Sequence, residues 1–276
     1  MFFNTHFEIY PSVTCIRILN NLNLKVMKQL MLAVMAVVLV AGTVLAEGNQ
    51  IPLIGSKAPS IKAQSTDGKI TFPDDFGSSW KILFSHPADF TPVCSSELLE
   101  LANLQPQFNK LGVKVAVIST DNVAVHNMWK AHLEDINYKN HGKIDIHFPL
   151  IEDVDGVASR KYGMLHEPTS TNRDIRGVFI IDDKNVVRAI NFYPVQVGRN
   201  MQEIVRLVQA LQTTDRMYVY TPANWEQGDD YLVPYFPYTK AEVAANPEVK
   251  DLYYEVSDRM WFMKAKEQQV VLNNDK

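Results

Sequence analysis

One short stretch limits the possible folds of this chain more than any other. Residues 81–85, KILFS, are a nearly continuous apolar run of strand length, and residues 86–94, HPADFTPVC, follow it directly. Leucines and a phenylalanine then recur at helical spacing over residues 98–108, which is the pattern of a helix with one apolar face. A buried strand that leads through a proline-bracketed loop into an amphipathic helix predicts a layered α/β domain.

The next segment repeats this order. Residues 114–119, KVAVIS, have the composition of a second buried strand. Asp121 is a good N-cap, and residues 125–136 then place Val125, Met128, Trp129, His132, Leu133 and Ile136 on one helical face. A strand–helix–strand–helix order follows, which is typical of a sheet with parallel strands.

The pattern changes further along the chain. GVFII at 177–181 and VVRAINFY at 186–193 flank a four-residue polar turn, so they predict an antiparallel hairpin. Asn200 begins a last amphipathic helix, with Glu203 three residues later in a pattern like a capping box. Together these segments predict an α/β fold with a thioredoxin-like sheet.

The N-terminus has the features of a secretory signal. Lys25 and Lys28 precede an apolar run at 30–45, and Val-Leu-Ala at 44–46 offers a cleavage site. Met27 is an alternative start, because residues 27–46 form a complete signal by themselves. We therefore expect residues 1–46 to be removed and the remainder to be secreted or periplasmic. The alternative is an uncleaved segment that anchors the protein in a membrane, since the run approaches spanning length.

Two domains are expected after the signal. The α/β domain covers residues 47–212, and a smaller C-terminal extension domain covers residues 213–276, where the composition shifts to proline, tyrosine and charged residues. The extension carries too many large aromatic side chains to be fully solvated. We expect these side chains to cover another protein surface.

Charge and cysteine content narrow the function. The net charge is −4, and long basic runs are absent from the sequence, so we expect no nucleic-acid partner. The chain has two cysteines, Cys15 and Cys94, and Cys15 lies within the expected signal. The mature chain then cannot form an internal disulfide, and Cys94 serves either packing or chemistry.

The local pattern favours chemistry at Cys94. If the helix begins near Thr91, Pro92 occupies its first position, where a missing N–H does no harm. Cys94 then lies in the first turn, where free backbone N–H groups and the helix dipole favour an anion, and a thiolate is the nucleophilic form of the thiol. The hydroxyl of Thr91 is close enough to donate to the sulfur or to a bound oxygen, and Pro87 can shield one side of the pocket.

These residues also form a known signature. Pro87, Thr91 and Cys94 are spaced as Pro-x-x-x-Thr-x-x-Cys, which resembles the active site of the peroxiredoxins, and HPADFTPVCSSEL resembles the 1-Cys or peroxiredoxin 6-type branch of this family (AhpC/TSA). Three later blocks are similar to this family in the same order: residues 148–164, 176–200 and 221–225.

The resemblance implies roles for further residues. Arg176 would lie against Cys94 and stabilise both the thiolate and the oxygens of a peroxide, and Arg199 would support it. Glu97 would orient one of these arginines, or would only complement the helix dipole. His86 would either tune the pocket or be a buried core residue with satisfied hydrogen bonds.

The resemblance further implies a thiol-dependent peroxidase, an antioxidant enzyme that reduces hydrogen peroxide and organic hydroperoxides without cofactor or metal. Two-cysteine relatives carry a resolving cysteine where this chain has Thr221. An external reductant, a thioredoxin-like protein or a small thiol, would therefore recycle Cys94. The extension would pack in a homodimer or larger homo-oligomer.

Two other functions are considered. A thioredoxin-type disulfide oxidoreductase needs a Cys-x-x-Cys pair, and the residue three before Cys94 is Thr91. A non-enzymatic redox sensor or holdase chaperone, in which oxidation of Cys94 only switches assembly, stays open as the alternative.

Overall fold

The computed structural model describes residues 26–29, 31–32 and 51–265. The expected signal segment and its cleavage site lie almost wholly outside these residues, although residues 26–29 and 31–32 are helical. Within the described part of the chain, none of the helices combines the length and the apolar character needed to cross a membrane. The residues up to Gly48 form a unit separate from the rest, and the description below concerns the second unit.

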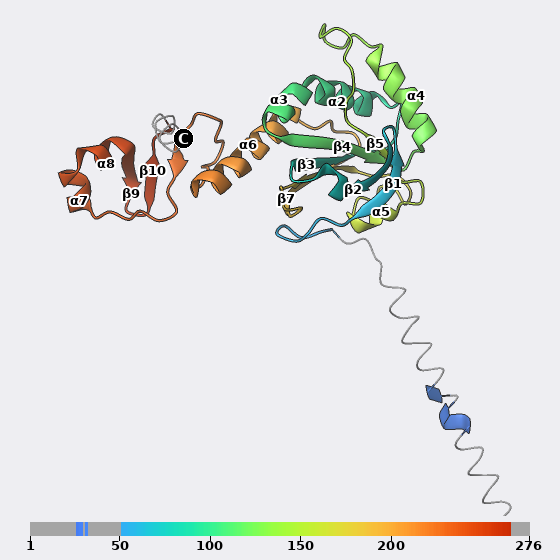
Figure 1. Ribbon diagram of the computed structural model, residues 1–276, viewed down its shortest axis with the longest axis horizontal. Helices are drawn as coiled ribbons and strands as arrows, with labels where there is room; N and C mark the ends of the chain where they lie inside the picture. The colour runs from blue at the N-terminus through green and yellow to red at the C-terminus, as the bar shows by residue number, and fades with distance from the viewer. Residues whose placement is uncertain (1–25, 30, 33–50, 266–276) are drawn as a thin grey trace, which may run out of the picture. The chain divides into compact units, whose positions relative to one another are not determined.

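A seven-stranded mixed sheet is the centre of this unit (Figure 1). Its spatial order is β2-β1-β5-β4-β3-β6-β7, in which β3 pairs parallel with β4, β4 pairs parallel with β5, and β6 pairs antiparallel with both β3 and β7. The hairpin and the parallel strands expected from the sequence are therefore present. The strands are β1 (Ile61–Ser65), β2 (Gly68–Phe72), β3 (Trp80–Ser85), β4 (Val113–Ser119), β5 (Leu150–Glu152), β6 (Arg176–Ile181) and β7 (Val187–Tyr193).

Helices cover both faces of the sheet, with α2 and α4 on one side and α5 on the other (Figure 1). The first core packs α2, α4 and α6 against the sheet through Leu98, Trp129 and Val205. The second packs Ala158 of α5 against Phe179 and Leu83. The helices are α2 (Pro92–Asn103), α3 (Gln105–Lys110), α4 (Val123–Glu134), α5 (Val157–Lys161) and α6 (Met201–Met217), and η1 (Asp74–Phe76) is a short 3-10 turn.

The start of α4 differs from the sequence-based expectation. Asn122, and not Asp121, is the N-cap, and its side chain accepts from the backbone N–H of Val125. The buried residues of α4 are His126, Trp129 and Leu133, whereas Met128 is 66% exposed. Asp121 is used elsewhere, because it accepts from the backbone N–H of Asp89 and from Arg173.

The C-terminal region forms a small three-stranded sheet. Its order is β8-β10-β9, and Trp225 and Tyr231 pack with Ala210 of α6 in a separate core. The expected domain boundary at residue 212 falls inside α6, which continues to Met217. The elements are β8 (Tyr231–Leu232), α7 (Lys240–Ala245), α8 (Pro247–Leu252), β9 (Tyr253–Ser257) and β10 (Met260–Met263).

Candidate active site

Cys94 lies in the first turn of α2, which follows strand β3 after the loop of residues 86–91. Thr91 is extended (φ −99°, ψ 146°), and Pro92 is the first helical residue, where its missing N–H leaves no hydrogen bond unmade. Cys94 is fully buried (0% exposed). Its position matches the sequence-based expectation, and the free N–H groups of this turn favour a negative sulfur.

Arg176 provides the positive charge next to the sulfur. It is the first residue of β6, and its Nη1 lies 3.2 Å from Sγ of Cys94 and 2.7 Å from Oε2 of Glu97, donating to both. Its Nε and Nη2 donate to the carbonyl of Val195 at 2.9 and 2.6 Å. Because four contacts hold this buried guanidinium, it faces the sulfur in a fixed orientation.

Glu97 is shared by two arginines. It lies one turn after Cys94 in α2, and Arg199 donates to it from the backbone N, Nε and Nη2 at 2.7, 2.9 and 2.7 Å. Burial by itself would raise the pKa of Glu97, but the charge and hydrogen bonds of Arg199, together with the charge of Arg176, lower it below its usual value. Two guanidinium groups therefore share one carboxylate, and that of Arg176 also faces the sulfur of Cys94.

Ser85 positions Arg176 from the neighbouring strand, which sequence reasoning did not foresee. Its Oγ donates to the carbonyl of Ile175 at 2.7 Å and accepts from the N–H of Gly177 at 2.8 Å. The residues on both sides of Arg176 are therefore tied to one hydroxyl. A side chain at position 177 would not fit, because a Cβ there would come within 2.8 Å of Oγ of Ser85.

The loop before α2 holds Pro87 and Thr91. Pro87 is buried. The hydroxyl of Thr91 donates to the carbonyl of Ala88 at 2.9 Å and not to the sulfur, which was one of the two expected acceptors, the other being a bound oxygen. Phe90 has a left-handed backbone (φ 55°), which is uncommon for a bulky residue and concentrates at functional sites.

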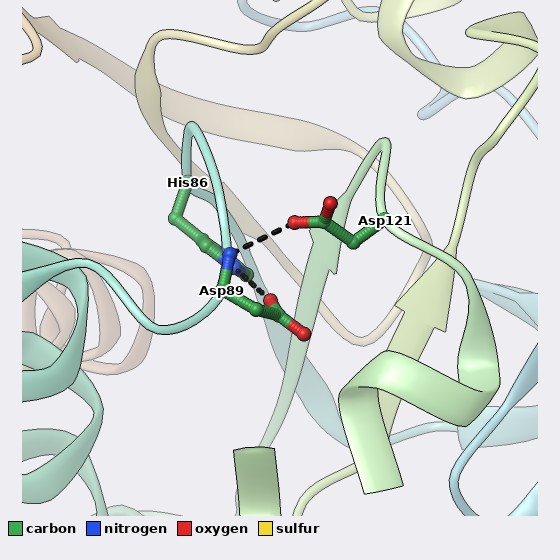
Figure 2. Close-up of side chains that lie close together, drawn as sticks. All are labelled: His86, Asp89 and Asp121. Carbon is green, nitrogen blue, oxygen red and sulfur yellow. Dashed lines mark hydrogen bonds and ion pairs between the residues drawn. The ribbon is translucent and has the colours of Figure 1, made fainter. Parts of the chain in front are cut away.

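A second charged cluster lies at the start of the same loop (Figure 2). Oδ1 of Asp89 lies 2.8 Å from Nε2 of His86, and Oδ2 lies 2.7 Å from Nδ1 of His126. The backbone N–H of Asp89 donates to Asp121 at 2.8 Å. Asp89 and His126 were not expected from the sequence. Asp89 was visible inside the motif, but nothing marked His126 as its partner.

The electrostatics of His86 differ from those of an ordinary core histidine. Burial lowers its pKa, and the charge of Arg199 acts in the same direction against the opposing effect of Asp89. Its Nδ1 is buried and has no hydrogen-bond partner among the described residues. His86 is therefore a buried histidine whose hydrogen bonds are only partly satisfied. The sequence left open whether His86 tunes the site or is a core residue with satisfied hydrogen bonds, and the structure lies between these two interpretations.

The atoms of His86, Asp89 and Asp121 could also be considered as metal ligands, since they lie within 4.8 Å of one another. Each carboxylate oxygen of Asp89 already meets a histidine nitrogen, and Asp121 meets Arg173 at 2.6 Å. Hydrogen bonds and ion pairs within the protein account for this grouping.

The chain matches known sequences over most of its length. Residues 54–190 match the AhpC/TSA family, and residues 210–241 match the C-terminal domain of 1-Cys peroxiredoxin. A peroxiredoxin of Methanosarcina mazei is 46% identical over 185 residues, which are 67% of this chain and 84% of that protein. The chain belongs to the peroxiredoxin family. A peroxiredoxin of Aquifex aeolicus is 45% identical over 175 residues, 63% of this chain and 77% of that one.

Solved structures place this peroxiredoxin among one-cysteine members. A yeast mitochondrial 1-Cys peroxiredoxin, whose thiol resolving mechanism uses glutathione/thioredoxin systems, is similar with a TM-score of 0.66 and 36% identity, covering 78% of this chain and all of that one (100%). A peroxiredoxin 6 of Arenicola marina is similar with a TM-score of 0.67 and 33% identity. The match covers 77% of this chain and 98% of that one. The thioredoxin-like fold with a C-terminal extension is thereby confirmed, and the protein is a thiol-dependent peroxidase.

Proposed function

We propose that this peroxiredoxin reduces hydrogen peroxide and organic hydroperoxides through Cys94 alone, as an antioxidant enzyme that maintains redox homeostasis. The observation that supports this most strongly is the 3.2 Å contact between the sulfur of Cys94 and the guanidinium of Arg176 at a helix N-terminus. This arrangement stabilises the nucleophile before reaction and the developing charge on oxygen during it.

The proposed reaction has two stages. The thiolate of Cys94 attacks one peroxide oxygen, the O–O bond breaks, and the leaving oxygen takes up a proton to become water or an alcohol. Cys94 is then a sulfenic acid. Because Cys15 and Cys94 are the only cysteines, an external thiol condenses with the sulfenic acid, releasing water, and a second thiol frees Cys94 as the mixed disulfide is reduced.

Roles follow for the surrounding residues. Arg176 contacts the reacting sulfur, Thr91 and Pro87 shape the pocket, and Glu97 and Arg199 hold Arg176 in place. The hydroxyl of Thr91 needs only to leave the carbonyl of Ala88 to donate to a peroxide oxygen.

The reductant and the location are also proposals. The yeast mitochondrial relative uses glutathione/thioredoxin systems, and we assign the same class of donor, a thioredoxin-like protein or a small thiol. The N-terminal pattern supports a secreted or periplasmic enzyme after cleavage, with a membrane anchor as the alternative. Tyr218 (85% exposed) and Tyr235 (79% exposed) are candidates for burial in a homodimer.

Stopped-flow measurement of peroxide consumption with dithiothreitol as the donor tests this function. Cys94→Ser should abolish consumption, and Thr91→Val should slow it. Thr214→Val is a matched control, because the hydroxyl of Thr214 also donates to a carbonyl three residues earlier (Leu211). Near-normal consumption by Cys94→Ser would reject the peroxidase role of Cys94 and favour a redox sensor or holdase.

Intact mass after one equivalent of peroxide tests the one-cysteine cycle. We expect a sulfenic acid, which excess peroxide converts to sulfinic acid. A disulfide-linked dimer as the main product would contradict this cycle.

A further inference from the structure

The carboxylate of Asp89 is divided between two buried imidazoles, one on each side. His86 begins the loop that carries Pro87 and Thr91, and His126 lies in the first half of α4. The side chains of His86, Asp89 and His126 are 0%, 1% and 0% exposed. Bulk solvent therefore does not screen these groups.

The hydrogen-bond partners of His126 define its protonation. Its Nε2 lies 3.2 Å from the backbone carbonyl of Ile151, and a carbonyl only accepts, so Nε2 carries a proton. Its Nδ1 lies 2.7 Å from Asp89. Burial would raise the pKa of Asp89, but the hydrogen bonds from His126 and His86 lower it, so Asp89 is a carboxylate that can only accept. With an acceptor facing each ring nitrogen of His126, the geometry fits a ring that carries hydrogen on both nitrogens.

The same reasoning makes His86 neutral. Its Nε2 faces the other oxygen of Asp89 at 2.8 Å and must donate to it. Its Nδ1 is buried without a partner among the described residues, which fits a bare lone pair better than a second N–H, because a buried N–H without an acceptor is rare. A neutral His86 also avoids repulsion with His126 and Arg199, whose charges both oppose its protonation.

We propose that Asp89 and His126 form a buried carboxylate–imidazolium pair that acts as a positioning device for the peroxidase reaction. The pair fixes His86 as the neutral tautomer with hydrogen on Nε2, and it holds the loop of Pro87 and Thr91 against the first turn of α2.

The loop geometry supports this positioning role. The loop is fixed at its start by the N–H of His86 donating to Ile118 at 3.2 Å, and in its middle by Asp89, whose N–H reaches Asp121 (Figure 2). The ring of His86 lies 5.0 Å from that of Trp129, and the indole N–H of Trp129 donates to Ser95, the neighbour of Cys94, at 3.3 Å. A displaced Asp89 would therefore disturb both the loop before α2 and, through Trp129 and Ser95, the first turn of α2.

Nitrogen-15 NMR of the histidine rings tests the protonation directly and does not depend on activity. In the wild-type protein at neutral pH, we expect both nitrogens of His126 to be protonated, and His86 to carry hydrogen on Nε2 only. Asp89→Asn should return His126 to a neutral ring and release the fixed tautomer of His86. A neutral His126 in the wild-type protein would overturn the proposal.

Two replacements of His126 separate positioning from bulk stability. The amide nitrogen of His126→Asn can take the place of Nδ1 and still donate to Asp89, whereas that of His126→Gln takes the place of Nε2 and keeps only the bond to Ile151. Cys94 oxidation should slow by about ten- to a hundredfold in His126→Gln and Asp89→Asn. His126→Asn should recover much of this loss.

His141 is an exposed histidine. The control variant His141→Gln should therefore behave as wild type. Rates are compared at a temperature where circular dichroism shows every variant folded. Equal rates for the Asn and Gln variants, or a wild-type rate in Asp89→Asn, would refute the positioning role. This kinetic readout rests on the proposed function. If the wild-type protein does not consume peroxide, the proposed function fails, and the NMR result alone decides the protonation of the pair.

Discussion

Glu97 and Asp174 are both buried carboxyl groups. Glu97 contacts Arg176 and Asp174 precedes it by two residues, but the two groups differ in their hydrogen-bond partners. Glu97 receives four hydrogen bonds from Arg176 and Arg199, and its pKa is lowered. Asp174 is two residues before Arg176 and fully buried (0% exposed), and neither of its carboxyl oxygens has a hydrogen-bond partner among the described residues.

Burial raises the pKa of Asp174 to about 7, and the charge of Asp153 adds to the rise. Two effects lower the pKa of Asp174 in opposition: hydrogen bonding by Ser159 and the charge of Arg173. The hydroxyl of Ser159 already donates to Asp153 at 2.6 Å. The difference between the two carboxyl groups teaches that the partners of a buried acid, and not its burial, decide whether it is ionised.

The largest effect is expected at Glu97. Glu97→Gln removes the counter-charge of two buried guanidinium groups, so the free energy of unfolding at pH 7 should fall by about 3–5 kcal/mol. Because the folded pKa of Glu97 is lowered, its stabilisation exists above the usual value of 4.5 and is lost as the pH falls through the folded value. The gap between wild type and variant should therefore narrow below pH 4.5.

Urea unfolding at several pH values measures this gap. Glu100→Gln is the matched control, because Glu100 lies on the same helix but pairs with the exposed Lys139, and it should lose much less. Equal losses in the two variants would show that the arginine pair does not need Glu97.

Arg176→Met should have the next largest effect, on rate. Glu97 keeps Arg199 as its partner, so the fold should survive, while the sulfur loses its guanidinium contact. Peroxide consumption should fall by about 10²- to 10³-fold, the usual loss when one charge-stabilising donor is removed. Stopped-flow rates of peroxide consumption check this. Arg206→Met is the control, because Arg206 forms an ion pair with Glu203 on α6, and its rate should stay near that of the wild type. A decrease of less than tenfold in the rate would show that Arg176 does not stabilise the transition state.

Asp174→Asn should stabilise the protein. Since the folded pKa of Asp174 is raised to about 7 from 3.8, the folded state holds its proton more tightly, and wild-type stability falls as the pH rises from about 4 to about 7. The variant avoids this loss, so it should gain about 1–2 kcal/mol at pH 8, reduced from the full linkage value because a buried amide also lacks partners. At pH 4 the two proteins should be alike.

Thermal unfolding across this pH range is the measurement. Asp153→Asn is the informative contrast, because Asp153 accepts from the N–H groups of Ala158 and Ser159 and its replacement should destabilise. A stability gain that does not change with pH would mean that Asp174 is ionised already.

Sequence reasoning succeeded where the chemistry is local. The alternation of β3, α2, β4 and α4, Pro92 at the first position of α2 and Cys94 in its first turn all depend on neighbouring residues, and the structure confirms them. The motif also led to Arg176, which the fold brings to the sulfur across 82 positions of sequence. Such a contact follows from a family resemblance and not from periodicity.

Sequence reasoning failed where contacts between distant segments decide which residues are buried. The helical face expected for α4 included Met128, but the exposed fraction of Met128 is 66% and His126 is buried. Trp129 and Leu133 pack in the core, and the face they share also contains His126, whose ring meets Asp89. The hydroxyl of Ser85 and the burial of Asp174 likewise depend on which strands lie side by side. Residue composition carries no signal for that order.

The smallest expected effect concerns Arg173, whose charge acts on the Asp174 side of the comparison. Its guanidinium pairs with Asp121 at 2.6 Å and is 44% exposed, and its charge lowers the pKa of Asp174. Arg173→Gln should cost at most about 1 kcal/mol at pH 5, as surface ion pairs do. It should also raise the pKa of Asp174 further, so the pH range over which stability is lost extends upward.

Comparison in two backgrounds isolates this charge effect. In the wild-type background Arg173→Gln should lose slightly more stability at pH 8 than at pH 5, because the unfavourable ionisation of Asp174 is no longer offset. In the Asp174→Asn background the same replacement should cost an equal amount at both pH values, since the group that responds to the charge is gone. Lys143→Gln, which breaks an exposed pair with Asp135, should show no such dependence in either background. A pH dependence that persists without Asp174 would assign the effect to Asp121, and the charge of Arg173 would then have no part in the contrast between Glu97 and Asp174.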